Sequence, residues 1–298
     1  MIRLAHVADI HLGARLRAVP DYPGCPAIDP VEDAYAAFAA LLQRILDERY
    51  AGVLLAGDLF DRHEATPRAL ATAEQALADL HDAGIPVALI WGNHDAESAL
   101  PQHLRLPPTT WLAPADHPAT HRWPDLGIAL HAQSIAARDD LRDLAAGYPR
   151  PLAAATNIAL LHTSLTGQHS RRACAPTTLA TLAAHGYDYW ALGHVHQRTH
   201  LGQASYAGSP HPARKSETGP RGFLELRLSG NLTTHPVDTS PVIREPLTAT
   251  TEDDIWKQFD NYPPAARLVI WTLNAPTDLL APARAAARNY PNFAVALP

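Results

Sequence analysis

The sequence predicts an α/β fold with a small second domain at its C-terminal end. Five short apolar runs are typical of strands, and each ends in a cluster of polar residues: 2–9, 52–58, 85–95, 156–162 and 187–194. Helical patterns lie between them, and the alternation of strand-like and helix-like segments restarts after about residue 240. We therefore expect a large α/β domain over residues 1–238 and a small domain over 239–298.

The expected helices follow from apolar periodicity and from capping residues. A helix is predicted within 29–49, with Asp29 as N-cap and Glu32 as its capping-box partner. Its apolar face comprises Tyr35, Phe38, Leu41, Leu42, Ile45 and Leu46. Two further helices are expected over 67–83 and 177–185, because a glycine follows each of them.

Two other stretches are distinguished by composition and pattern. Residues 99–125 are rich in proline and turn residues, so we expect an irregular excursion across the surface. From residue 244 the segments "REPLTAT", "EDDIWKQFDN", "RLVIWTLN", "DLLAPARAAARNY" and "NFAVAL" follow a β-α-β-α-β pattern. That pattern predicts the small second domain.

Composition favours a globular protein without a membrane span. The 298 residues are 47% hydrophobic and 18% charged, and Cys25 and Cys174 form no CxxC pair. The N-terminal apolar run contains a histidine and an aspartate, so we expect no signal peptide, no membrane partner and a cytoplasmic location. A net charge of −6 argues against coating nucleic acid by bulk charge but leaves a metal-dependent nuclease open.

Polar groups suited to divalent metals collect where the strand-like runs end. In α/β sheets, ligands gather outside the carboxyl ends of strands, and alternate residues of a strand share one side. Seven donors are too many for one tetrahedral ion but suit two ions about 3.5–4 Å apart that clamp a phosphate. Mixed imidazole and carboxylate donors favour manganese, iron or zinc over magnesium or calcium. The candidate ligands are Asp9, His11, Asp58, Asn93, His162, His194 and His196.

Each motif also has an explanation without a metal. An aspartate or glycine after a strand is an ordinary turn residue, and a single histidine such as His162 is usually structural. The chain holds 17 histidines, so a pair such as His194 and His196 can arise by chance. The metal interpretation depends on all five clusters occurring together at strand ends.

These motifs resemble the signature of the calcineurin-like metallophosphoesterases. In order they are DIH (9–11), GDLFD (57–61), GNHD (92–95), the lone His162 and GHVH (193–196). Over roughly residues 1–235 the amino-acid sequence is similar to the SbcD-type DNA-repair exonucleases, in their YhaO-like branch. The resemblance implies a four-layer αββα sandwich followed by a small C-terminal α+β capping domain.

The resemblance also implies roles for individual residues. One metal would be held by Asp9, His11 and His196, with Asp58 bridging to a second metal on Asn93, His162 and His194. His94 would face the scissile phosphate, stabilise the developing charge and protonate the leaving oxygen, with Asp95 orienting its ring. Two divalent ions, manganese first, would activate water for attack on a DNA phosphodiester.

Partners follow from the same resemblance. We expect DNA as substrate and a homodimer. We also expect an SbcC-type ATPase as partner, which in relatives docks on a segment that follows the part matched here. Basic residues in loops near the motifs are candidates for phosphate contacts, although plain surface charge explains any single one. They are Arg62, Arg171, Arg172, Arg198, Arg214, Lys215 and Arg221.

Two alternative functions stay open at this point. One is a small-substrate phosphoesterase of the same superfamily that acts on cyclic nucleotides or nucleotide-like pyrophosphates. The other is a scaffold that keeps the fold without the chemistry, against which the full set of candidate ligands argues. The main expectation is a 3′-to-5′ exonuclease and endonuclease in DNA repair or DNA-end processing.

Overall fold

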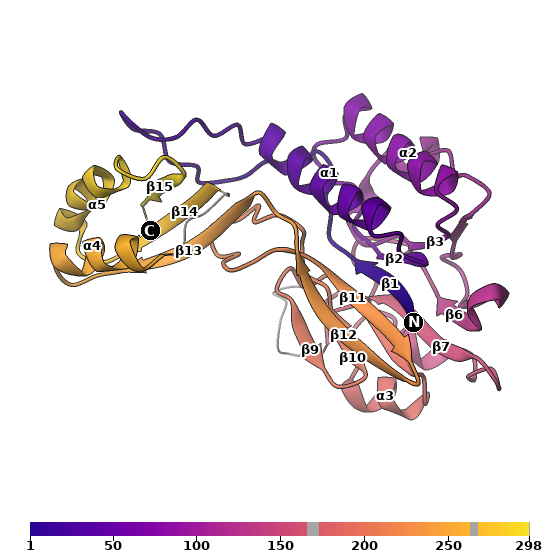
Figure 1. Ribbon diagram of the computed structural model, residues 1–298. Coiled ribbons are helices and arrows are strands. Elements are labelled where there is room, and N and C mark those ends of the chain that lie inside the picture. Colours follow the sequence, from indigo (N-terminus) through magenta and orange to yellow (C-terminus); the bar gives the residue numbers. More distant parts are fainter. Residues whose placement is uncertain (166–172, 263–267, 298) are drawn as a thin grey trace.

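The computed structural model describes residues 1–165, 173–262 and 268–297. Two six-stranded sheets form its main body (Figure 1). The first sheet has the spatial order β12 (Asn231–Asp238), β11 (Gly222–Ser229), β1 (Ile2–Val7), β2 (Gly52–Ala56), β3 (Val87–Ile90) and β4 (Thr110–Leu112). The second has the order β5 (Ala119–Trp123), β6 (Ile128–Ala132), β7 (Thr156–His162), β8 (Tyr189–Gly193), β10 (Ala204–Tyr206) and β9 (Thr199–Leu201).

The two sheets pack face to face, and helices cover their outer faces. Leu54 and Ile90 of the first sheet and Leu130 and Leu160 of the second belong to the apolar cluster between the sheets. The helices α1 (Glu32–Asp47) and α2 (Pro67–Asp82) cover the first sheet, whereas the short α3 (Leu179–Ala184) packs on the second. The predicted α/β class and four-layer αββα sandwich are therefore confirmed, with a thin fourth layer.

Local sequence explains where these helices begin and end. The side chain of Thr66 accepts a hydrogen bond from the Ala69 N–H and begins α2, and Gly84 with φ of 72° follows its end. At α1, Asp29 accepts from the N–H groups of Val31 and Glu32 at 3.0 Å. The expected capping box was wrong, because the Glu32 carboxylate pairs with Arg68 of α2 instead.

Residues 99–125 are not wholly irregular, contrary to expectation. β4 pairs parallel with β3, and β5 pairs antiparallel with β6, so each forms one edge of a sheet. Both strands are short and only partly buried, so neither needs the apolar alternation by which strands are recognised. Short 3₁₀ turns connect several elements: Asp95–Glu97, Pro101–His103, Pro124–Leu126, Ala145–Gly147 and Thr277–Leu279.

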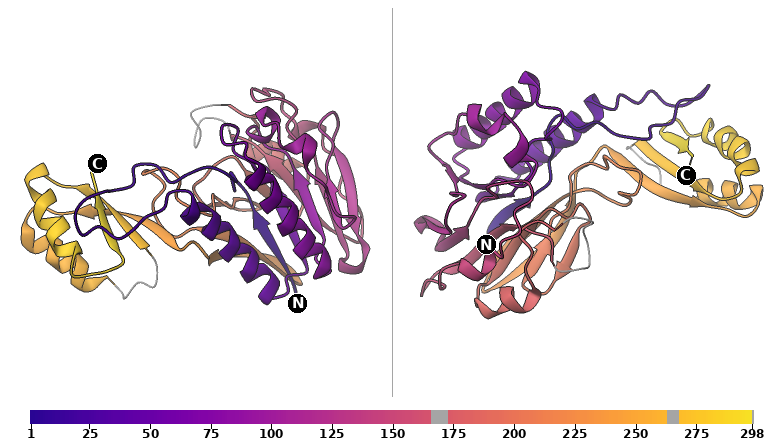
Figure 2. Two further views of the ribbon diagram at one scale, coloured as in Figure 1. Left: turned by 90° about the horizontal axis from the view of Figure 1, so that it is seen from above. Right: turned by 180° about the vertical axis from the view of Figure 1, so that it is seen from behind.

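The C-terminal segment forms a three-stranded parallel sheet with two helices. Its elements are β13 (Val242–Thr248), α4 (Glu252–Asn261), β14 (Leu268–Asn274), α5 (Leu280–Ala287) and β15 (Phe293–Ala296). This is the predicted β-α-β-α-β order, and its apolar core, with Phe259 and Trp271, is its own. Figures 1 and 2 show this unit beside the main body. The boundary expected at residue 238 falls between β12 and β13, and a domain division there remains a proposal.

Several contacts join the C-terminal unit to the main body, among them an apolar cluster that includes Leu16, Val242 and Ile270. The coil after β1 reaches it in all three views, and the Tyr22 hydroxyl accepts the Val295 N–H at 3.1 Å (Figures 1 and 2). Arg244 of β13 is fully buried and donates to backbone carbonyls of Arg17, Ala18 and Pro212. None of the helices in the described part of the chain is long and apolar enough to cross a membrane.

Candidate metal centre

Five strands from both sheets bring the predicted site residues to one place. Asp9 follows β1, Asp58 follows β2 and Asn93 follows β3, all in the first sheet. His162 ends β7, and His194 directly follows β8 in the second sheet. Strands β1, β2 and β3 run parallel, as do β7 and β8, so their carboxyl ends share an edge. All seven candidate ligands meet at that edge.

One half of the cluster gathers around His11. Its Nε2 lies 3.0 Å from Nε2 of His196 and 3.6 Å from Oδ2 of Asp58. Donor atoms of Asp9, His11 and His196 all lie within 4.8 Å of one another. Two facing imidazole nitrogens and a buried carboxylate form a donor set that a divalent cation fits.

The other half gathers around Asn93. Its Oδ1 lies 3.1 Å from Nε2 of His162 and 3.0 Å from Nδ1 of His194. His162 Nε2 is also 3.4 Å from Oδ2 of Asp58, and its Nδ1 donates to the Ala56 carbonyl at 3.0 Å. Asp58 therefore touches both halves, which is the position that a bridging carboxylate needs.

The backbone at four of these residues is in a conformation that non-glycine residues rarely adopt. The φ angles are 52° at Asp9, 50° at His11, 54° at Asp58 and 97° at His194. Such residues cluster at functional sites, because the surrounding structure must hold them there at a cost of about 1–3 kcal/mol each. In this chain the strain coincides with the candidate ligands.

Glycines next to the ligands allow the two sheets to approach closely. A Cβ at Gly193 would lie 1.9 Å from the Ala56 carbonyl oxygen, which belongs to β2 of the opposite sheet. A Cβ at Gly92 would lie 2.3 Å from Oδ1 of Asp58. Only glycine fits at either point.

The residue beside His94 is Asp61, and the expectation that Asp95 orients this ring was wrong. Asp61 Oδ2 lies 3.4 Å from His94 Nδ1. The Asp95 carboxylate instead accepts the N–H groups of Leu59 (3.2 Å), Phe60 (2.8 Å) and Gly92 (2.9 Å). Burial raises the pKa of Asp95 to about 7, although these three donors act in the opposite direction. The Asp95 carboxylate thus links the loop after β2 to the loop after β3.

Glu217 is a site residue that sequence reasoning missed. Its Oε1 lies 2.6 Å from Nδ1 of His196, and its Oε2 accepts the Arg214 N–H at 3.0 Å. Burial raises the pKa of Glu217. The hydrogen bond from His196 and the charge of that histidine lower the pKa by more, so that the net value is about 2. The carboxylate is therefore ionised and fixes which nitrogen of His196 faces the centre. Twenty-one residues separate the pair, so no local spacing signalled it.

The charged side chains of the cluster shift one another's pKa values. Burial lowers the pKa of His162, but Asp58 and Asp9 raise it more, to about 9. Burial raises the pKa of Asp58, while the neighbouring histidines hold it well below its usual range. A divalent cation has to displace the proton of His162 to bind there, so binding is coupled to pH.

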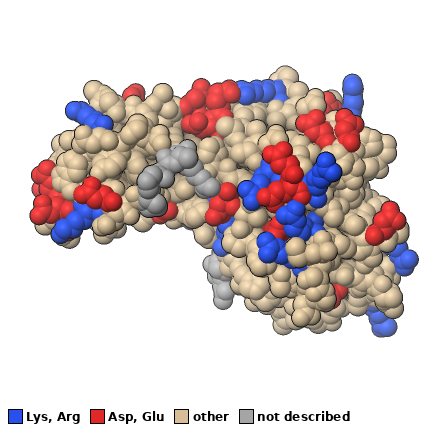
Figure 3. Space-filling model, in the orientation of Figure 1, with Lys and Arg blue, Asp and Glu red and all other residues tan. Residues whose placement is uncertain are grey.

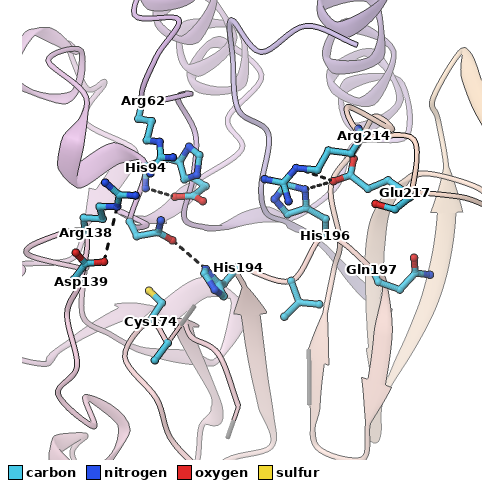
Figure 4. A pocket seen from close by; sticks show the side chains of 15 residues that line it. Arg62, His94, Arg138, Asp139, Cys174, His194, His196, Gln197, Arg214 and Glu217 are labelled. Atoms are coloured by element: carbon cyan, nitrogen blue, oxygen red, sulfur yellow. Dashed lines mark hydrogen bonds and ion pairs between the residues drawn. The ribbon is translucent and has the colours of Figure 1, made fainter. Parts of the chain in front are cut away.

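The cluster opens into a pocket of about 600 Å³ (Figure 4). Arg62 and Arg138 lie with His94 on one side of it, and Arg214 lies with His196 and Glu217 on the other (Figure 4). Arg138 was not among the sequence candidates. It shares Glu97 with Arg62, at 3.0 and 3.1 Å respectively.

One of the candidates for phosphate contact proves to be structural. Arg221 is buried and donates to the backbone of His196 and Thr218, so it is not available to a substrate. Arg198 pairs with Asp238 at 2.8 Å. Lys215 is exposed, whereas Arg171 and Arg172 lie outside the described residues. On the face seen in Figure 3, Lys and Arg lie interspersed with Asp and Glu.

Comparison with known proteins decides the family. The profile of the calcineurin-like phosphoesterases matches residues 2–198. This chain belongs to that family. The phosphoesterase is 28% identical over 231 residues to the uncharacterized metallophosphoesterase YhaO of Bacillus subtilis, covering 75% of this chain and 57% of YhaO. It is 25% identical over 234 residues to the DNA double-strand break repair protein Mre11 of Methanopyrus kandleri, covering 71% and 49%.

The phosphoesterase spans about half the length of these curated relatives. Among solved structures, a dimetal phosphatase from Danio rerio superposes with a TM-score of 0.45 at 13% identity, covering 80% of this chain and 99% of that one. Calcineurin-like phosphoesterases use a dimetal site, and the donor clusters described above fit such a site.

Proposed function

We propose that this phosphoesterase is a metal-dependent DNA nuclease that cleaves phosphodiester bonds as a 3′-to-5′ exonuclease and endonuclease, in DNA repair or DNA-end processing. The observation that carries the proposal is a cluster of seven donors that opens into one pocket, which is also lined by Arg62, Arg138 and Arg214. Guanidinium groups are suited to phosphates of a polynucleotide on either side of the bond that is cut. Similarity to Mre11 supports the choice of DNA.

Each residue of the centre has a role in this proposal. Asp9, His11 and His196 would hold one cation, and Asn93, His162 and His194 a second, with Asp58 between them. Two divalent cations, manganese first and iron or zinc as alternatives, would neutralise the phosphodiester and make water a nucleophile near neutral pH.

His94 would act on the substrate directly. It lines the pocket, and its side chain keeps 17% of its surface exposed. Asp61, on its Nδ1 side, would orient the ring so that Nε2 donates to the phosphate and protonates the leaving oxygen. Asp61 is a positioning residue, because it contacts His94 and is not among the residues that line the pocket.

The test is cleavage of end-labelled single- and double-stranded DNA with manganese. We expect His94→Ala to lower cleavage by at least about 100-fold, the usual contribution of a general acid. Both metals should still bind, as measured by elemental analysis. His117→Ala, in an exposed loop, is the matched control. Cleavage by His94→Ala at the parent rate would refute the role of His94.

A second function is favoured by the pocket volume. About 600 Å³ lies within the range of sites for small molecules, so a phosphodiesterase acting on nucleotides is the alternative. Turnover of cyclic nucleotides, measured beside that of DNA under the same conditions, separates the two. Faster turnover of the small substrate would replace the nuclease proposal.

The proposed partners and location have tests of their own. A homodimer is expected to appear in light scattering of the purified chain. An SbcC-type ATPase is expected to co-purify when both are produced together, and fractionation of cells should place the protein in the cytoplasm. A monomer at micromolar concentration would contradict the first expectation.

A further inference from the structure

The thiol of Cys174 lies beside the second group of candidate ligands. Its Sγ, a ring nitrogen of His162 and a ring nitrogen of His194 all lie within 4.8 Å of one another. Figure 4 shows Cys174 and His194 lining the same pocket. In the sequence, Cys25 and Cys174 form no CxxC pair and indicate neither a zinc knuckle nor a disulfide scaffold.

The backbone holds the thiol firmly in this place. The Cys174 N–H donates to the Ser164 hydroxyl at 2.8 Å, and the Ser164 N–H donates back to the Cys174 carbonyl at 2.8 Å. Ser164 lies two residues after His162, so the thiol is fixed against the strand end that carries this ligand. On the next residue, the Ala175 N–H donates to the Asp140 carbonyl at 2.7 Å.

The two halves of the centre therefore differ in chemistry. Around Asp9, His11 and His196 the donors are nitrogen and oxygen alone. Around Asn93, His162 and His194 a sulfur joins them. Thiolate ligands favour zinc and iron over manganese and magnesium, because they are softer donors.

We propose that Cys174 is a further ligand at the second metal position and that it biases this position toward zinc. This inference rests on the metal centre of the proposed function. On binding, the thiol releases its proton to solvent and forms one sulfur–metal bond, without any change of oxidation state. The alternative is that Cys174 only fills the apolar cluster of which it is also a member.

Cobalt(II) provides the first test. Protein stripped with a chelator and titrated with cobalt(II) should develop a thiolate-to-cobalt charge-transfer absorption in the near ultraviolet. Cys174→Ser and Cys174→Ala should lose this band, whereas Cys25→Ala, the matched control at the other free cysteine, should keep it. Two bound cobalt ions in the parent without the band would overturn the proposal.

Competition between metals provides the second test and guards against a misfolded variant. The full-length parent, equilibrated with equimolar zinc and manganese, should retain zinc at one of its two positions. In Cys174→Ser the preference for zinc over manganese should fall by at least about 10-fold. Loss of a residue that merely supports a metal ligand already lowers affinity by that factor. Bound zinc should also slow iodoacetamide labelling of Cys174 but not of Cys25. An unchanged zinc preference together with unprotected Cys174 would refute the proposal.

These outcomes are separate from the nuclease proposal. The cobalt band and zinc preference are measured without DNA. A parent that shows both and cuts no DNA would retain Cys174 as a ligand and lose the nuclease assignment. A parent that cuts DNA with manganese but lacks the band would retain the nuclease assignment and lose Cys174 as a ligand.

Discussion

Glu217 accepts a hydrogen bond from Nδ1 of His196, and this single contact decides which ring nitrogen is left to bind a cation. An ionised carboxylate only accepts hydrogen bonds, so Nδ1 must donate and Nε2 must face His11. Carboxylate–histidine pairs of this kind fix the tautomer of a metal ligand and raise its basicity. Glu217 thus orients a candidate ligand and would support the centre through His196.

We expect Glu217→Gln to weaken binding of manganese by about 10–100-fold, because the amide cannot hold the proton of His196 as a carboxylate does. Isothermal titration calorimetry of the chelator-stripped protein measures this. Glu252→Gln, in the exposed first turn of α4, is the control. Equal affinities in both variants would show that Glu217 serves stability alone.

His6 makes the fold sensitive to acid. It is fully buried, and burial lowers its pKa to about 3, below the ordinary value of 6.5. Its nitrogens contact the Tyr189 hydroxyl and the Leu192 carbonyl at 3.0 and 3.1 Å. The unfolded state therefore binds a proton between pH 6.5 and 3 that the folded state does not, so stability falls as pH decreases through that window.

In His6→Gln this contribution should disappear. The free energy of unfolding of the parent should fall more steeply than that of the variant below pH 6.5, by up to about 1.4 kcal/mol per pH unit. Urea denaturation at several pH values measures both slopes. Parallel slopes would mean that His6 is not neutral in the folded state.

At this scale the sequence is informative about some residues only. The seven candidate ligands follow strands, so the rule that strand ends converge was enough to group them. Glu217 and Cys174 lie in loops without such a pattern, and their contacts became visible only in three dimensions. Asp95 was misassigned because three backbone donors, which no motif encodes, occupy its carboxylate.

Among the elements, the approach of β8 to β2 has the strictest steric requirement. Gly193 ends β8 directly before His194, and the Ala56 carbonyl at the end of β2 occupies the space that a side chain would need. The distance of 1.9 Å from that oxygen to an added Cβ cannot be relieved by a side-chain rotation, since the obstacle is backbone. The two sheets would have to separate at the centre.

Gly193→Ala should therefore destabilise the fold by more than about 2 kcal/mol, as overpacking does, and should abolish tight binding of metals. Gly147→Ala is the control, because there the nearest atom lies 3.9 Å from an added Cβ. Thermal unfolding and metal titration measure the two effects. A Gly193→Ala protein with parent stability would mean that the strands have room to shift.

The elements also differ in how well the sequence predicts them. β2, β7 and β8 are continuous apolar runs buried on both faces, and all were expected. β4 and β5 are edge strands with partly exposed side chains, and each is defined by its pairing with a neighbouring strand rather than by its own alternation. At α1 only the capping-box partner was wrong, because Arg68 of α2 pairs with the Glu32 carboxylate, while Asp29 accepts the first N–H groups as expected.

For the whole molecule, Arg244 is a buried link between the C-terminal unit and the main body. Its guanidinium is fully buried, with Nε 3.0 Å from the Pro212 carbonyl. Burial lowers its pKa, but the charge of Glu217 opposes this shift. Its own carbonyl accepts the Gly219 N–H at 2.9 Å. The loop that carries Glu217 is therefore held at both ends by β13.

Arg244→Met should destabilise the fold by about 3 kcal/mol, because it keeps the volume but leaves buried carbonyls without donors. Calorimetry should show one transition in the parent and a separate, earlier transition of the C-terminal unit in the variant. Arg15→Met, whose side chain is 59% exposed, should change little. A single unshifted transition in Arg244→Met would exclude this role.

The carbonyls that Arg244 holds belong to segments far apart in the chain, at residues 17–18 and at Pro212. A recombinant chimera joined between β12 and β13 would bring in a foreign strand without this guanidinium. Its main body would keep every candidate ligand of the metal centre yet lose the anchor of the loop behind His196. Exchange of the C-terminal unit between relatives would thus have to preserve an arginine at this position of β13, or replace both coils along with it.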